Sequence, residues 1–349
     1  MGRNPHEAEE LMNAYDVIIV GAGPTGLACA IEARRHGLKS LVLEKGCVVN
    51  SLYRYPVNMV FFTTPELLEI GELPFVSQRE KPTRQEALKY YRLAAQHFQL
   101  AVRQYEEVLK IEGADGKFEI HTRNRLGVPG SYAAKKVVVA IGYYDKPNLL
   151  GIPGEDLPKV FHYYTEAHPY YDCDVAVIGG KNSAAEAALD LYRHGARVTL
   201  IHRSAQLSEK IKYWVRPDLE NRIRNKEIKA FFDTRVIEIR PDGIRLTPSH
   251  ATEGEGTVQN LKNDFVFALT GYHPDVDFLK RAGVEVEPRR MRPCCNSETF
   301  ESNVAGLYLA GVIIAGLDSN EIFIENGRFH GKQVLADIAA KLQGRTQSA

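Results

Sequence analysis

The hydrophobic and polar positions of the chain follow an order that occurs twice. One copy covers residues 16–46 and the other covers residues 174–204, and the two align without a gap. In each copy, a short apolar run leads into a glycine-rich turn, and an amphipathic stretch of helical period then leads to a second apolar run. This order predicts a strand, a helix and a second strand, formed twice in one polypeptide.

Outside the two copies, apolar runs and turn residues predict further elements. A helix is expected over residues 84–98, after the capping residue Thr83, because its apolar residues fall on one face. Strands are expected over residues 102–113 and 117–123, joined by a tight turn. Buried strands that end in glycine or just beyond it are expected over residues 137–142, 264–271 and 306–312, and a last helix is expected from near Ile322 to Leu342.

The first glycine turn has the residues that hold a pyrophosphate at the start of a helix. Gly21 permits a tight turn, Gly23 lets the backbone approach the phosphates, and Gly26 lets the helix pack closely on its strand. Glu44 ends the second apolar run, where a carboxylate accepts hydrogen bonds from ribose hydroxyls and repels a 2′-phosphate. The first site is therefore predicted to bind FAD or NAD and not NADP.

The second glycine turn differs from the first in its charges. Lys181 takes the place of Gly23, so its ammonium could contact a phosphate directly. His202 takes the place of Glu44 and is followed by Arg203, and a basic pair at this position suits a 2′-phosphate. The second site is therefore predicted to bind NADPH. Three more basic residues could add charge or form a solvated helix face: Lys210, Lys212 and Arg216.

Composition and cysteine spacing exclude several classes of protein. Lys and Arg number 44 together, as do Asp and Glu, so no net charge indicates a nucleic acid or an acidic partner. No apolar stretch approaches the roughly 20 residues of a membrane span. Residues 1–13 lack the apolar region of a signal peptide and are expected to fray. The five cysteines show neither C-x-x-C nor zinc spacing, which predicts a reduced, cytoplasmic setting without a metal site.

The two fingerprints and several longer strings of the sequence resemble a known family of flavoproteins. The strings are TPELLEIG (64–71), KPTR (81–84), GGKNSA (179–184) and IFIENGRFHG (322–331). Over nearly its whole length the chain resembles the bacillithiol-disulfide reductases, which are related to the low-molecular-weight thioredoxin reductases. The resemblance implies bound FAD, NADPH as the electron donor and a homo-oligomer. Lys181 belongs to this family's own version of the second turn.

Two positions depart from the pattern of these relatives. Val312 stands where related thioredoxin reductases carry an aspartate that contacts the sugar-alcohol chain of the flavin. Thr25 stands where members of the family often carry a cysteine proposed to be redox-active, and a threonine cannot form a mixed disulfide. Cys47 is the best substitute, although an incidental loop thiol is the alternative. Adjacent Cys294 and Cys295 could close only a strained ring.

The residues expected to contact the cofactors come from the glycine turns, the strand ends and the start of the last helix. For FAD they are Gly21, Gly23, Pro24, Thr25, Gly26, Glu44, Lys45, Gly142, Gly311, Ile322 and Phe323. For NADPH they are Gly179, Lys181, Asn182, Ser183, Ala184, His202 and Arg203. A helix that begins near Ile322 would point backbone N–H groups at the flavin ring. Spacing singles out no catalytic residue.

The order of the elements predicts an α/β protein with two Rossmann-like dinucleotide-binding domains of three-layer ββα type. The NADP-binding domain is expected at residues 166–286, inserted between the two parts of an FAD-binding domain at residues 1–165 and 287–349. The combination of an FAD-binding and an NADP-binding domain in one chain predicts an oxidoreductase that passes hydride from NADPH to FAD.

The acceptor of the electrons stays open at this stage. A low-molecular-weight thiol disulfide, with bacillithiol disulfide as the substrate that the resemblance implies, is the first hypothesis. A small electron carrier such as a ferredoxin, a flavodoxin or a thioredoxin-like protein is the second. A nucleotide sensor without turnover is the third, and NADPH-driven reduction of the flavin would exclude it.

Overall fold

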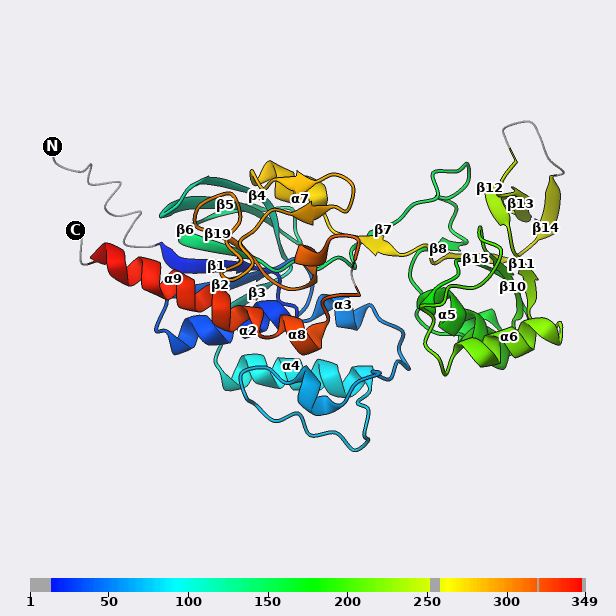
Figure 1. Cartoon of the computed structure of the whole chain (residues 1–349), viewed down its shortest axis with the longest axis horizontal. Helices are drawn as coiled ribbons and strands as arrows, with labels where there is room; N and C mark the ends of the chain where they lie inside the picture. Colours follow the sequence, from blue (N-terminus) through cyan, green and yellow to red (C-terminus); the bar gives the residue numbers. More distant parts are fainter. Residues whose placement is uncertain (1–13, 252–257, 319, 347–349) are drawn as a thin grey trace. The chain divides into compact units, whose positions relative to one another are not determined.

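The computed structural model describes residues 14–251, 258–318 and 320–346 (Figure 1). Residues 1–13, for which the sequence predicts a frayed end, lie outside the described part. The chain forms two compact units. Unit 1 comprises the described residues of Met1–Tyr53, Met59–Lys146 and His273–Ala349, and unit 2 comprises those of Arg54–Asn58 and Pro147–Tyr272.

Unit 1 is built on a seven-stranded mixed sheet. Its parallel part has the order β3-β2-β1-β6-β19, and the amino-terminal half of β6 continues into an antiparallel meander with β5 and β4. The strands are β1 (Tyr15–Val20), β2 (Ser40–Glu44), β3 (Val102–Gln104), β4 (Glu106–Ala114), β5 (Lys117–Asn124), β6 (Pro129–Val139) and β19 (Leu307–Leu309). Because β19 follows unit 2 in the chain yet pairs with β6, the predicted return of the last strand to the first sheet is confirmed.

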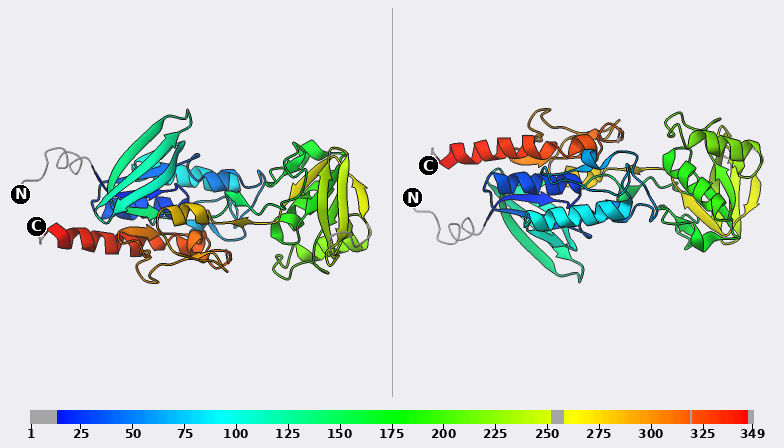
Figure 2. Two further views of the ribbon diagram at one scale, coloured as in Figure 1. Left: turned by 90° about the horizontal axis from the view of Figure 1, so that it is seen from above. Right: turned by 90° about the horizontal axis from the view of Figure 1, so that it is seen from below.

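Helices cover one face of this sheet. The helix α2 (Pro24–Arg35) packs on β1 and β2 through its small and apolar residues, and α9 (His330–Thr346) runs alongside it (Figure 2). The helix α4 (Arg84–His97) begins with a capping box between Thr83 and Glu86, close to where the sequence predicts. Shorter elements are α3 (Asn50–Tyr53), η1 (Pro65–Leu68), α7 (Val276–Arg281), β17 (Val286–Glu287), β18 (Arg292–Pro293), η3 (Val312–Ala315) and α8 (Ile324–Gly327).

Unit 2 repeats this architecture. Its parallel sheet has the order β11-β10-β9-β15-β8, and β12-β13-β14 form a separate antiparallel sheet. The strands are β8 (Val160–Phe161), β9 (Asp174–Ile178), β10 (Arg197–Ile201), β11 (Lys229–Phe231), β12 (Thr234–Arg240), β13 (Gly243–Pro248), β14 (Gln259–Lys262) and β15 (Phe265–Ala268), and the helices are η2 (His168–Tyr170), α5 (Asn182–Arg193) and α6 (Arg216–Arg224). The predicted α/β class with two Rossmann-like units is confirmed. No helix of the described chain is long and apolar enough to cross a membrane.

The limits of the units differ from those that the sequence predicts. The structure divides the chain after Lys146 and after Tyr272, earlier than the predicted limits at residues 165 and 286. The reason is local pairing: β8 joins the sheet of unit 2 beside β15, and α7 packs against β4 in unit 1. The chain crosses between the units at β7 (Lys146–Pro147) and β16 (Tyr272–His273), which pair with each other.

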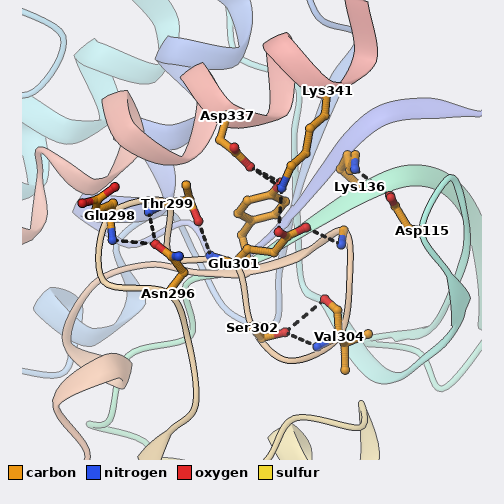
Figure 3. Close-up of polar contacts among 12 residues, drawn as sticks. Asp115, Lys136, Asn296, Glu298, Thr299, Glu301, Ser302, Val304, Asp337 and Lys341 are labelled. Atoms are coloured by element: carbon orange, nitrogen blue, oxygen red, sulfur yellow. Dashed lines mark hydrogen bonds and ion pairs between the residues drawn. The ribbon is translucent and has the colours of Figure 1, made fainter. Parts of the chain in front are cut away.

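A network of charged side chains ties β19 to α9 (Figure 3). The Tyr308 hydroxyl donates to Asp337 at 2.6 Å, and the Lys341 ammonium bonds to Asp337 at 2.7 Å and to Glu301 at 2.6 Å. Burial, together with the neighbouring carboxylates, raises the pKa of Tyr308 well above its usual range, so its hydroxyl remains a donor. The network therefore fixes the position of β19, and β19 leads directly to Gly311.

Candidate functional site

The carboxyl ends of four parallel strands meet at one edge of the unit 1 sheet. Val20 of β1 is in register with Leu43 of β2 and with Val139 of β6, and Val139 is in register with Leu309 of β19. The residues that follow these strands are thereby brought together: Gly21, Glu44, Gly142 and Gly311. In an open α/β sheet, a ligand binds beyond this edge, where the strand order reverses.

The first turn has no room for side chains at two of its glycines. Gly21 has a φ of 105°, and a Cβ on it would lie 2.6 Å from the carbonyl oxygen of Ala140. A Cβ on Gly26 would lie 1.9 Å from the carbonyl oxygen of Gly21. The start of α2 therefore sits directly on the turn, and the turn sits on the end of β6.

Open space lies in front of α2. A Cβ on Gly23 or on Gly142 would meet no atom of the described chain within 4 Å beyond its neighbours. Gly23 caps α2 without a side-chain hydrogen bond and Pro24 has no N–H, so the first free amides of the helix are those of Thr25 and Gly26. Uncapped helix amides beside open space suit a phosphate group. These residues therefore fit the pyrophosphate of a dinucleotide.

Glu44 is fixed at the end of β2 by backbone hydrogen bonds. Its Oε2 accepts from the amide of Ala22 and its Oε1 from the amide of Gly46, both at 2.8 Å. Burial raises the pKa of Glu44, and the two amides act in the opposite direction. Each carboxylate oxygen keeps a lone pair for a ribose hydroxyl. Neighbouring Lys45 forms an ion pair with Asp145 at 2.9 Å.

Thr25 lies between two glycines of the C-terminal segment. A Cβ on Gly311 would lie 3.1 Å from the Thr25 hydroxyl oxygen, and a Cβ on Gly327 would lie 3.3 Å from the same atom. Gly311 has a φ of 82°, which favours glycine. Thr25, the position at which the resemblance leads us to expect a cysteine, is therefore closely packed by the turn after β19 and by α8.

His330 holds this turn, a role that the sequence prediction missed. The Gly311 amide donates to Nδ1 of His330 at 3.0 Å, and the imidazole stacks on Phe300 with ring centroids 4.3 Å apart. Burial lowers the pKa of His330 to about 4, so the ring is neutral at neutral pH and Nδ1 is its acceptor. Although His330 lies in the family-like string of residues 322–331, no spacing rule connects it to Gly311.

We expect His330→Asn to reduce the acid sensitivity of unit 1. The ordinary pKa of 6.5 falls to about 4 on folding, so between these values the unfolded chain binds a proton that the folded chain does not. The stabilisation is complete above about pH 6.5 and about 3 kcal/mol of it is lost as the pH falls to about 4. The measurement is the urea midpoint of FAD release at several pH values. His97→Asn, at the exposed end of α4, is the control and should keep the wild-type pH dependence.

The start of the C-terminal helix differs from the prediction. The single helix expected from near Ile322 to Leu342 is divided, because α8 is one turn and the long helix α9 begins only at His330. Phe323 precedes α8, and its amide donates to Asn326 at 2.8 Å. Its ring meets that of Phe62 edge to face, with centroids 5.8 Å apart. A contact of Ile322 or Phe323 with a flavin stays a prediction.

The second turn opens α5 in unit 2. Gly179 packs on β15, since a Cβ there would lie 2.6 Å from the carbonyl oxygen of Leu269. Lys181 caps α5 with an extended backbone and is exposed. A Cβ on Gly180 would lie 2.3 Å from the ring of His202, so this imidazole lies against the turn. The predicted contact residues Asn182, Ser183 and Ala184 form the first turn of α5.

The basic residues beside this turn do not act alike. Burial, and then the charge of Arg203, lower the pKa of His202, so exposed Arg203 supplies the positive charge at the end of β10 at neutral pH. The expected basic pair is thus one cation and one neutral imidazole, and the negative charge of a bound phosphate would favour protonation of that imidazole. Two of the three further basic residues are engaged in ion pairs, Lys212 with Glu186 and Arg216 with Glu220, both at 2.7 Å.

All five cysteines are thiols. Cys29 is fully buried in α2, and burial raises its pKa to about 12. Cys47 Sγ lies 3.8 Å from Asn50 Oδ1. Cys294 is exposed, whereas burial raises the pKa of Cys295. Within the described residues, no group of three or more His, Cys, Asp or Glu side chains is placed to hold a metal ion.

Comparison with known proteins places the chain among redox enzymes. Residues 18–311 match the family described as pyridine nucleotide-disulphide oxidoreductase. The chain is 46% identical to bacilliredoxin reductase Bdr of Bacillus subtilis (strain 168) over 325 residues, which are 93% of this chain and 97% of the relative. Two solved structures of bacillithiol disulfide reductase Bdr are also similar. The structure from Bacillus cereus has 44% identity and a TM-score of 0.89 over 94% of this chain, and the structure from Staphylococcus aureus has 42% identity and a TM-score of 0.88 over 95% of this chain. Each match covers 99% of the solved chain.

Proposed function

The chain belongs to the pyridine nucleotide-disulphide oxidoreductase family as an FAD- and NADPH-dependent enzyme that acts on a disulfide, and we propose that bacillithiol disulfide is its acceptor. The observation that carries the proposal is the 44% identity, over 94% of this chain, to a structure named for that substrate. The balanced reaction is NADPH, a proton and the disulfide giving NADP⁺ and two thiols.

We assign the two cofactors to the two glycine turns by their charges. The turn of unit 1 has an acidic strand end, Glu44, and open space at Gly23, which suit the ribose and the pyrophosphate of FAD. The turn of unit 2 has exposed cations at Lys181 and Arg203, which suit the phosphates of NADPH. When bound, FAD supplies the chemistry that transfers two electrons from NADPH to a disulfide.

The protein itself supplies no evident dithiol relay between the flavin and the acceptor. Thr25 cannot form a mixed disulfide, and Cys29 beside it in α2 is fully buried with a pKa raised to about 12. The other thiols include no C-x-x-C pair. We propose that the acceptor disulfide reaches the flavin directly, and that Thr25, packed against Gly311, shapes that approach.

An anaerobic titration of the FAD-loaded enzyme tests this route. We expect uptake of two electrons per FAD, because a flavin accepts two and no protein disulfide shares them. Cys47→Ser and the double variant Cys294→Ser/Cys295→Ser should give the same count. Uptake of four electrons in the wild type, reduced to two in either variant, would show a redox-active disulfide and contradict the direct route.

A second acceptor is favoured by the name of one relative. The Bacillus subtilis protein is named a bacilliredoxin reductase, so the acceptor of this chain could be a redoxin in place of the small disulfide. Steady-state NADPH oxidation is measured with bacillithiol disulfide and with oxidised bacilliredoxin to compare these two acceptors, and with glutathione disulfide as a control. A higher kcat/KM for the redoxin would make the protein the preferred acceptor, and turnover of glutathione disulfide at the same rate would contradict both.

We also propose that the enzyme acts in the cytoplasm and as a homo-oligomer. The cysteines show no spacing typical of a disulfide framework, which supports a reducing compartment. The resemblance to the bacillithiol-disulfide reductases supports the oligomer, and sedimentation of the FAD-loaded protein measures it.

A further inference from the structure

The segment between β10 and α6 carries two exposed aromatic rings. Tyr213 is 83% exposed and Trp214 is 48% exposed, and their rings meet edge to face with centroids 4.8 Å apart. The segment itself is anchored, because Leu207 and Ile211 are each only 4% exposed and belong to the core of unit 2. Adjacent tyrosine and tryptophan side chains that an anchored loop presents to water are typical of a binding surface.

The same segment is fastened to the second glycine turn. The amide of Ser208 donates to the carbonyl oxygen of Gly180 at 3.1 Å. The Asn182 side chain bonds in both directions, donating to the carbonyl oxygen of Lys210 at 3.1 Å and accepting from the amide of Lys212 at 2.9 Å. The turn that opens α5 and the loop that presents the aromatic pair are therefore one connected structure.

The positive charges beside the turn and the loop suit the phosphates of a nucleotide. The aromatic pair suits a different part of the nucleotide, its base. The exposed cations of the turn and of the segment are Lys181, Arg203 and Lys210. Lys212, by contrast, is neutralised in part by Glu186 at 2.7 Å and lies 5.8 Å from the ring centre of Trp214. An aromatic platform binds the π-face of a base, whereas cations bind its phosphates.

We infer that Trp214 forms a platform, flanked by the Tyr213 ring that stands at 88° to it, on which the adenine base of NADPH stacks. The inference rests on the proposed assignment of NADPH to the second glycine turn. The segment with the aromatic pair follows Arg203 directly in the chain, and Arg203 would bind the 2′-phosphate on the adenosine ribose of NADPH. Of the two ends of NADPH, we therefore assign the adenosine end to this segment. With the pyrophosphate assigned to the start of α5 and the 2′-phosphate to Arg203, we place the base on the segment after Arg203, which Ser208 and Asn182 hold against that turn.

Trp214 is the only tryptophan of the chain, so its emission tests the inference directly. The FAD-loaded enzyme is titrated with 2′,5′-ADP, which carries the adenosine end of NADPH and no redox-active ring. We expect a saturable change in tryptophan emission, with a midpoint equal to the inhibition constant of 2′,5′-ADP against NADPH. Competitive inhibition without any change in emission would overturn the platform.

Variants separate stacking from phosphate binding. Trp214→Leu should weaken 2′,5′-ADP and 5′-ADP by the same factor, about tenfold, because both carry adenine. It should raise the KM for NADPH with little change in kcat, and Trp214→Phe should restore most of the affinity. Arg203→Ala should weaken only the 2′-phosphorylated ligand. Tyr171→Leu is the matched control, since Tyr171 is 71% exposed in unit 2 outside the segment and should leave every value unchanged.

The outcomes distinguish the platform from the function on which it rests. If the wild type shows NADPH-driven flavin reduction while Trp214→Leu binds 2′,5′-ADP as tightly as the wild type, the platform alone is refuted. If NADPH fails to reduce the flavin in the wild type, the assignment of NADPH is refuted and the platform falls with it.

Discussion

Replacing Gly23 with alanine is expected to remove FAD from the protein and leave unit 1 folded. A Cβ at this position meets no atom of the described chain within 4 Å beyond its neighbours, so the fold can accept it. The same Cβ projects into the space in front of α2, where the pyrophosphate of FAD is expected to lie. We expect the Kd for FAD to rise by roughly 100-fold, which corresponds to about 3 kcal/mol. Fluorescence titration of the apo-protein with FAD measures this affinity.

Gly26→Ala is the comparison variant, because at this position the fold itself has no room for the added Cβ. Its Cβ would lie 1.9 Å from the carbonyl oxygen of Gly21, and backbone atoms cannot move aside as a flexible side chain does. This variant should lose FAD and also lower the melting temperature of the apo-protein, which Gly23→Ala should not. Gly344→Ala, near the end of α9, controls for the substitution itself, since its Cβ meets no atom of the described residues within 4 Å. Wild-type affinity of Gly23→Ala for FAD would place the pyrophosphate elsewhere.

The repeated strand, helix and strand were predictable because they depend on local pattern alone. Apolar runs, glycines at fixed positions and a helical period recur in residues 16–46 and 174–204, and the structure forms β1-α2-β2 and β9-α5-β10 from them. The residue types at the ends of the second strands were predictable for the same reason, since Glu44 and His202 hold equivalent places. The limits of the units were less predictable, because the pairing of β8 with β15 depends on contacts between distant segments.

The environment of the predicted site residues could not be read from spacing. Thr25 lies beside Gly311 and Gly327, where an added Cβ would meet it, and Gly311 in turn is held by His330, yet these residues come from opposite ends of the chain. The protonation of His202 also depends on burial, which makes it a neutral partner of Arg203. Sequence thus indicated which residues are expected to surround each cofactor, whereas their contacts and protonation states depend on the tertiary fold.

Lys136 forms a tertiary contact of this kind, a buried ion pair with Asp115. Lys135 and Lys136 are neighbours on β6, so their side chains alternate between faces. Lys135 pairs with Asp16 at the surface, whereas Lys136 is fully buried and bonds to Asp115 at 2.6 Å (Figure 3). Asp115 also lies against Gly306, where a Cβ would approach its Oδ1 to 2.4 Å, so this pair seats the start of β19. The other end of β19 leads to Gly311 and the expected flavin edge.

Asp115→Ala is therefore expected to destabilise unit 1 by about 3 kcal/mol and to promote loss of FAD. The variant removes the carboxylate that faces a fully buried ammonium, and breaking a buried pair from one side leaves a charge that water cannot reach. Urea unfolding followed by FAD fluorescence measures the change. Because Asp115 itself is 20% exposed, the effect should fall at the lower end of the range for buried pairs.

A second substitution should rescue this variant. The double variant Asp115→Ala/Lys136→Met removes the stranded charge and keeps much of the buried volume, so most of the lost stability should return. Glu107→Ala is the matched control, because Glu107 pairs with Arg123 at the surface, with side chains 45% and 52% exposed, and should cost at most about 1 kcal/mol. Equal destabilisation by Asp115→Ala and the double variant would mean that the carboxylate acts through Gly306 and the start of β19, and not through the charge of Lys136.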